Sequence, residues 1–198
     1  MVYRLDFKVD GGCRGNGQPD ALGAAACCLE YGNRYRSKTC RLDNDYTAPT
    51  SQRAEITAVI PALEWALERY DELESYPRLE VNIRSGSRYA VDCMTNWVHT
   101  WVRNGWTNSR GLEVANRDLI ERPSDLDDRA SELGSINYIW IPRSDNEDLR
   151  CVDGRPLASA SLLLLTCPSR GLLLIPTRGH YLAVKTSTIQ GDVLPASV

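Results

Sequence analysis

The sequence has few of the residues that build metal clusters and disulfide frameworks. It contains only two histidines, and its seven cysteines include no Cys-x-x-Cys pair. Zinc sites usually combine such pairs with histidine, and small disulfide frameworks usually show an even number of cysteines. The composition therefore indicates neither kind of site, and we expect reduced thiols, which are typical of the cytosol and nucleus.

Long apolar runs are also lacking. The leucine-rich runs at 162–165 and 172–175 hold four residues each, whereas a membrane helix needs roughly 20. A strand-like pattern begins almost at the first residue, in place of the apolar core of a signal peptide. We expect an intracellular protein, cytoplasmic or nuclear and not secreted, with no membrane partner and a monomeric state.

A strongly basic charge is missing as well. The net charge of -3 argues against a protein that binds nucleic acid through bulk charge. A local exception is the segment from residue 84 to residue 117, which contains five arginines and only two acidic residues, Asp92 and Glu113. This excess is typical either of a small phosphate-contacting patch or of a solvated helix face.

The first third of the chain follows the pattern of a β-meander. Apolar and polar residues alternate over 2–9, which predicts a strand that ends at Asp10 before two glycines. An apolar run at 23–31 predicts the return strand, and 33–42 predicts a third. Taken alone, Asp10 and its glycines indicate only a turn.

The middle of the chain alternates between helical and strand periods. Thr50 or Ser51 can cap a helix that continues to Tyr70, with a kink at Pro61. The later elements predicted are a strand over 79–84, a helix from about Ser87 to a break at 104–106, a helix over 116–133 interrupted at Pro123, and a strand over 136–141. The order predicts an α/β fold with a mixed five-stranded sheet flanked by helices.

The character of the sequence changes near residue 156. The last part combines leucine runs with proline and serine and shows no amphipathic period. We expect one domain over 1–155 and an atypical tail over 156–198 that is poorly ordered or loosely docked.

Three strings in the first 110 residues carry a family resemblance. DGG…NG begins at Asp10, QRAE ends at Glu55, and WVHTWVRNGW ends at Trp106. In this order and spacing the chain resembles type 1 ribonuclease H, which cleaves the RNA strand of RNA–DNA hybrids. The resemblance runs from about residue 2 to 148 and implies a ribonuclease H-like fold whose first three strands form an antiparallel meander.

The resemblance also implies a two-metal site. Asp10 would bridge two Mg²⁺ ions, with Mn²⁺ as an alternative ion, and Glu55 would hold one of them. Asp148 is the candidate for the fourth carboxylate, and the register leaves Arg150 and Asp153 as alternatives. Incompletely caged oxygen ligands of this kind suit magnesium.

The chain departs from the family at the third carboxylate. Where the family string T-D-S-x-Y has Asp, this chain has Gly86, which has no side chain to bind a metal. Asp92 lies six residues further on, roughly 9 Å along a helix, and is a poor substitute. We therefore expect second-metal affinity to fall and cleavage to be weakened or lost.

The substrate-binding positions match the family better than the catalytic ones. By resemblance, one group would meet the minor groove of the hybrid and read RNA 2′-hydroxyls, and a second would form a handle that grips the DNA strand. The tryptophans of the handle have a second interpretation, as core residues. The first group is Cys13, Arg14, Asn16, Ser51 and Gln52; the second is Trp97, Trp101, Trp106, Thr107, Asn108 and Ser109.

Three functions remain open from the sequence. The first is a hybrid ribonuclease that hydrolyses RNA with two Mg²⁺ ions and whose activity is weakened or lost. The second is a non-catalytic nucleic-acid-binding module that keeps the hybrid-binding surface. The third is a decayed product without function, which the two helix prolines and the missing carboxylate also fit.

Overall fold

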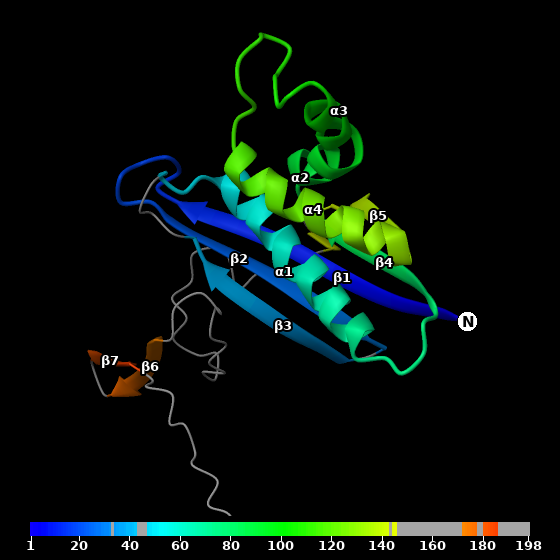
Figure 1. Ribbon diagram of the computed structural model, residues 1–198. Coiled ribbons are helices and arrows are strands. Elements are labelled where there is room, and N and C mark those ends of the chain that lie inside the picture. The colour runs from blue at the N-terminus through cyan, green and yellow to red at the C-terminus, as the bar shows by residue number, and fades with distance from the viewer. Residues whose placement is uncertain (33, 43–46, 143, 146–171, 178–179, 186–198) are drawn as a thin grey trace, which may run out of the picture. The chain divides into compact units, whose positions relative to one another are not determined.

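A five-stranded mixed sheet forms the centre of the fold (Figure 1). The computed structural model describes residues 1–32, 34–42, 47–142, 144–145, 172–177 and 180–185. The strands lie in the order β3-β2-β1-β4-β5, with antiparallel pairing from β3 to β1 and parallel pairing from β1 to β5. The predicted mixed sheet and its antiparallel meander are confirmed. The strands are β1 (Val2–Arg14), β2 (Leu22–Tyr31), β3 (Arg34–Arg41), β4 (Arg78–Ser85) and β5 (Gly134–Trp140).

The long helices cover one face of this sheet (Figure 1). Helix α1 (Ser51–Asp71) begins where the Thr50 hydroxyl accepts the backbone N–H of Arg53 at 3.2 Å. Between β4 and the last helix, the chain forms α2 (Arg88–Asp92), the π-helical turn η1 (Cys93–Trp97) and α3 (Val98–Arg103).

Helix α4 (Arg117–Leu133) corrects one prediction from the sequence. The expected interruption at Pro123 is wrong, because α4 continues as one helix through that residue. A proline inside a helix removes one hydrogen bond and costs about 3 kcal/mol. The Pro123 ring is buried, so its packing offsets part of that cost. Helix α1 continues through Pro61, as predicted, and the kink expected there stays a prediction.

The core lies between the sheet and α1. On β1, alternate residues Leu5, Phe7 and Val9 are at most 3% exposed, and they pack with buried residues of α1 such as Leu63. Each fully buried side chain of this size contributes about 1.5–3 kcal/mol through removal of apolar surface from water. A second buried cluster joins Ile56 of α1 to α2, α3 and α4. The two clusters fix the start of α1 against both the sheet and the later helices.

The last part of the chain contains a separate small sheet. β6 (Leu172–Thr177) and β7 (His180–Lys185) pair antiparallel. The chain divides into two compact units, 1–158 and 159–198. The boundary at 155/156 and the poor order of the tail stay predictions, since most of that segment lies outside the described residues. Among those described residues, no helix is long and apolar enough to cross a membrane.

Candidate active site and nucleic-acid interface

The two central parallel strands bring Asp10 and Gly86 to the same edge of the sheet. Their pairing ends with Val9 opposite Ser85, and Asp10 and Gly86 are the next residues. The end of β5 joins the same edge, because the backbone N–H of Ile141 donates to the Ser85 carbonyl at 2.9 Å. Carboxyl ends of parallel strands are the usual position of ligand sites in α/β sheets.

Glu55 reaches this edge from the first turns of α1. The backbone N–H of Gly11 donates to Glu55 Oε2 at 3.2 Å, and Glu55 is only 3% exposed. A Cβ atom on Gly11 would lie 2.2 Å from the carbonyl carbon of Ala54. Only glycine allows β1 and α1 to approach this closely. The structure therefore places the Glu55 carboxylate against the residue that follows Asp10.

The third family position offers no ligand. Gly86 has no side chain, and Asp92, at the end of α2, accepts a hydrogen bond from the Asn96 amide at 3.2 Å. In the part of the chain that the structure describes, no three His, Cys, Asp or Glu residues are grouped so that they could hold a metal ion. The predicted ligand Asp148 and its alternatives, Arg150 and Asp153, lie outside that part. Asp10 and Glu55 are thus the two carboxylates that the described site can offer.

The predicted minor-groove residues come together where the β1–β2 loop meets the start of α1. Asn16 Oδ1 accepts the backbone N–H of Ser51 at 2.7 Å, and the Cys13 thiol donates to the Pro49 carbonyl at 3.2 Å. Arg14 and Gln52 are exposed beside them. The loop and the helix start therefore form one surface next to Asp10 and Glu55, and the hydrogen bonds hold its shape.

The tryptophans of the predicted handle form a chain of ring contacts. Centroids lie 5.7 Å apart between Trp97 and Trp101 and 6.4 Å apart between Trp101 and Trp106. Trp101 and Trp106 are half-buried and pack on the second core cluster, whereas Trp97 is 39% exposed. Such contacts add about 0.5–1.5 kcal/mol each beyond burial. The core interpretation accounts for two of the rings, and Trp97 presents a surface to solvent.

The loop after α3 is held by its own polar groups. The Asn108 side-chain oxygen accepts the backbone N–H groups of Arg110 at 2.9 Å and Leu112 at 3.2 Å. Thr107 donates its N–H to the Asn104 side chain at 3.1 Å, while Ser109 is exposed. Asn108 therefore shapes the loop, and the predicted nucleic-acid contacts of these three residues stay predictions.

A residue of the QRAE string that the sequence analysis did not assign connects α1 to α4. The Arg53 guanidinium binds both carboxylate oxygens of Asp118, at 3.0 and 2.6 Å, and lies 3.4 Å from Asn116 Oδ1. The hydrogen bonds from Arg53 lower the pKa of Asp118. Asn116 has a left-handed φ of 61° and donates to the Tyr89 hydroxyl at 3.1 Å, and burial raises the pKa of Tyr89 to about 12. Because Arg53 precedes Glu55 by two residues, this network orients the helix turn that carries Glu55.

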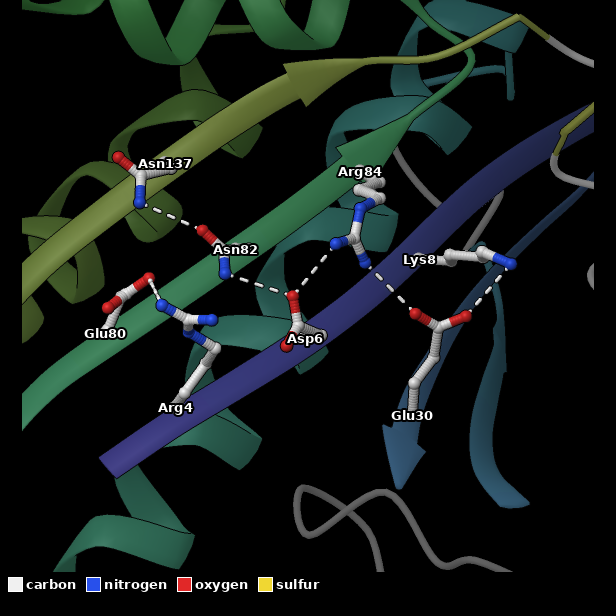
Figure 2. Close-up of polar contacts among 8 residues, drawn as sticks. All are labelled: Arg4, Asp6, Lys8, Glu30, Glu80, Asn82, Arg84 and Asn137. Carbon is white, nitrogen blue, oxygen red and sulfur yellow. Dashed lines mark hydrogen bonds and ion pairs between the residues drawn. The ribbon is translucent and has the colours of Figure 1, made fainter. Parts of the chain in front are cut away.

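The arginine excess of the sequence does not form one patch. Arg84 points from β4 to the sheet face opposite α1, where it binds Asp6 and Glu30 at 3.0 Å each (Figure 2). Arg117 pairs with Glu113 at 3.1 Å and with Glu121 at 2.8 Å. The three remaining arginines, Arg88, Arg103 and Arg110, are exposed. Of the five arginines, strand alternation sends Arg84 to another face, and two ion pairs neutralise Arg117, which leaves three.

Two further ion pairs lie on that opposite face (Figure 2). Lys8 binds Glu30 at 2.9 Å, and Arg4 binds Glu80 at 2.9 Å. Asn82 links the strands further by donating to Asp6 at 3.0 Å. Arg4, Lys8 and Arg84 are therefore each paired with a carboxylate on this face.

Comparison with known proteins finds relatives over most of the chain. A model of the RNase H family matches residues 4–142. A Ribonuclease H of Saccharopolyspora erythraea is 32% identical over 163 residues, which is 79% of this chain and 94% of that protein. A Ribonuclease H of Salmonella arizonae is 30% identical over 141 residues, covering 71% of this chain and 78% of that protein.

Solved structures show the same fold. LC9-RNase H1, described as a type 1 RNase H with the type 2 active-site motif, aligns with a TM-score of 0.58 and 24% identity, over 77% of this chain and 71% of that one. A foamy viral protease-reverse transcriptase in complex with RNA/DNA hybrid aligns with a TM-score of 0.52 and 18% identity, over 73% of this chain and 18% of that one. From the match to the family model and the identity to its members, the chain belongs to the RNase H family.

Proposed function

We propose that this protein binds RNA–DNA hybrids and that it cleaves their RNA strand weakly or not at all. Family membership supports the substrate, as does the hybrid bound by the foamy viral relative. One observation carries the loss of activity: Gly86 stands beside Asp10 at the end of β4, where a third carboxylate would face the site. We also infer that the protein acts inside the cell, in the cytoplasm or nucleus, as a monomer.

The two carboxylates suit part of a magnesium site. Asp10 and Glu55 supply the hard oxygen donors that Mg²⁺ or Mn²⁺ prefers, and the Gly11 N–H bond to Glu55 holds one oxygen in place. A pair of such ions supplies a metal-activated water and stabilises the leaving oxygen. Two carboxylates fit one ion that keeps several waters, and they do not fit two. Asp148 as a further ligand is part of this proposal.

The surfaces beside the carboxylates support hybrid binding. The β1–β2 loop and the start of α1 present Arg14, Asn16 and Gln52, whose polar groups can reach ribose 2′-hydroxyls and phosphates. The ring of Trp97, in the predicted handle, is 39% exposed. Neither surface includes residue 86, so binding can persist where catalysis does not.

A cleavage assay tests the proposal directly. The natural chain and Gly86→Asp are incubated with a labelled RNA–DNA hybrid at saturating Mg²⁺ and, separately, Mn²⁺. We expect Gly86→Asp to raise the cleavage rate by about 100-fold or more, since a positioned catalytic group commonly contributes that much. The control Gly86→Asn is uncharged and similar in size to Asp, so it should stay near the natural rate.

Two outcomes would contradict the proposal. Cleavage by the natural chain at the same rate as Gly86→Asp would show that the missing carboxylate is unimportant. Absence of hybrid binding in both proteins would remove the proposed substrate.

The second candidate function is a binding module without catalysis. The observation that favours it is the exposed ring of Trp97, which lies in the predicted handle of a chain that has Gly86 at the third carboxylate position. It predicts tight, salt-sensitive hybrid binding with no cleavage by either the natural chain or Gly86→Asp. Cleavage by Gly86→Asp decides for the first candidate.

A further inference from the structure

An exposed aromatic ring lies at the carboxyl end of β5, beside the strand that leads to Gly86. Trp140 is the last residue of β5, it pairs with Ser85, and it is 38% exposed. Neighbouring strands lie about 4.8 Å apart, so the end of β5 is roughly 10 Å from Asp10, which follows the last residue of β1 that pairs with β4. The ring therefore lies at the border of the candidate site, and none of the family strings in the sequence contains it.

A cation is stacked on this ring. The guanidinium carbon of Arg88, the first residue of α2, lies 3.9 Å from the centre of the Trp140 ring. Arg88 is exposed, and among the described residues no carboxylate makes an ion pair with it. Arg84 and Arg117, in contrast, each bind two carboxylates. Arg88 is thus a positioned positive charge without a neutralising partner in that part of the chain.

We propose that Arg88 and Trp140 form a phosphate-binding platform for the backbone of the bound hybrid. The inference rests on the proposed function, since it names a contact at the same site. Stacking on an indole face fixes the guanidinium through its plane and leaves the N–H groups at its rim for a phosphate. An arginine held in this way can bind two phosphate oxygens at once, which gives both strength and orientation.

The platform lies beside a position without negative charge. Gly86, two residues before Arg88, carries no carboxylate, so the negative charge that the family string would place there is missing. A phosphate that approaches Arg88 therefore meets less repulsion than it would beside an aspartate at residue 86.

Salt-dependent binding tests the platform. Binding of the full chain to a fluorescein-labelled RNA–DNA hybrid is measured between 50 and 200 mM KCl for the natural chain, Arg88→Gln and Trp140→Leu. Each phosphate contact contributes about 0.9 to the slope of log K against log salt concentration. We expect Arg88→Gln to make that negative slope shallower by about 0.9 and to weaken binding roughly 3- to 10-fold at the lower salt concentration.

Two further variants make the test specific. Arg34→Gln removes an exposed arginine at the far end of β3, opposite Tyr31, and should leave the slope unchanged. Trp140→Leu should weaken binding less than Arg88→Gln does, and adding it to Arg88→Gln should cause no further loss, because the ring acts through the guanidinium.

The failure of this inference can be told apart from the failure of the proposed function. If the natural chain shows no salt-sensitive hybrid binding, the proposed function fails. If the natural chain binds but Arg88→Gln keeps the slope and affinity of Arg34→Gln, only the platform is refuted. Thermal melts of all variants confirm that each is folded before binding is compared.

Discussion

Replacing Gly11 with alanine should separate β1 from α1 and loosen the Glu55 side of the site. The added Cβ would lie 2.2 Å from the Ala54 carbonyl carbon and 2.3 Å from the Glu55 nitrogen. Both are backbone atoms and cannot rotate away. Carbon atoms pack at about 3.5–4.0 Å, so the helix must move by more than about 1 Å. That movement also breaks the hydrogen bond from Gly11 to Glu55.

The cost follows from these two effects. Overpacking of a core contact costs about 1–3 kcal/mol, and loss of a buried hydrogen bond to a charged group costs about 1.5–3 kcal/mol. We expect a loss of about 3–5 kcal/mol in the free energy of unfolding. For a domain of this size, 1 kcal/mol shifts Tm by about 2–4 °C. The midpoint should therefore fall by roughly 6–20 °C in a melt followed by circular dichroism.

Gly17 provides the matched control. It has a φ of +75° and no atom within 4 Å of an added Cβ, so Gly17→Ala meets only backbone strain of about 1–2 kcal/mol. The reasoning is refuted if Gly11→Ala melts no lower than Gly17→Ala, since the close approach of strand and helix would then be dispensable.

Two further predictions concern titrating groups. Arg53 lowers the pKa of Asp118, so their pair stabilises the fold above the ordinary aspartate pKa of about 3.9 and loses that effect as pH falls through the lowered value. Asp118→Asn should therefore lower the free energy of unfolding at pH 7 but change it little at pH 2. Because Asp118 is 59% exposed, we expect a loss of at most about 1 kcal/mol at pH 7. Equal losses at both pH values would contradict the ion pair as the cause. Burial raises the pKa of both Cys27 and Cys93 to about 12. The contribution of these neutral buried thiols to stability is therefore full below the thiol pKa of the unfolded chain and is lost as the pH rises toward 12. Both thiols should resist Ellman's reagent at pH 8 in the native protein and react in urea; rapid native labelling of either, identified by mass spectrometry, would show that it is not buried.

The local pattern of apolar and polar residues predicted most helices and strands of this fold. Alternation over 2–9 and 79–84 marked two central strands, and of the two predicted caps, Thr50 and Ser51, the structure has Thr50. Pattern failed at Pro123, where the cost of one missing hydrogen bond is outweighed by contacts that no local window contains. It failed again at Arg84, whose place in a run of arginines gave no sign that carboxylates of β1 and β2 would neutralise it.

The sequence by itself determined which groups are present: Asp10 before two glycines, Glu55 early in a helix, and glycine in place of a carboxylate at 86. The predicted end of the first strand at Asp10 is wrong, because pairing with β2 continues β1 to Arg14. Only the tertiary structure decided which groups meet. Arg53 reaches Asp118, and Arg88 stacks on Trp140, across long stretches of chain. The physical reason is that periodicity depends on residues that are neighbours along the chain. These contacts depend instead on strand register and on helix packing, which bring together segments that are distant in the sequence.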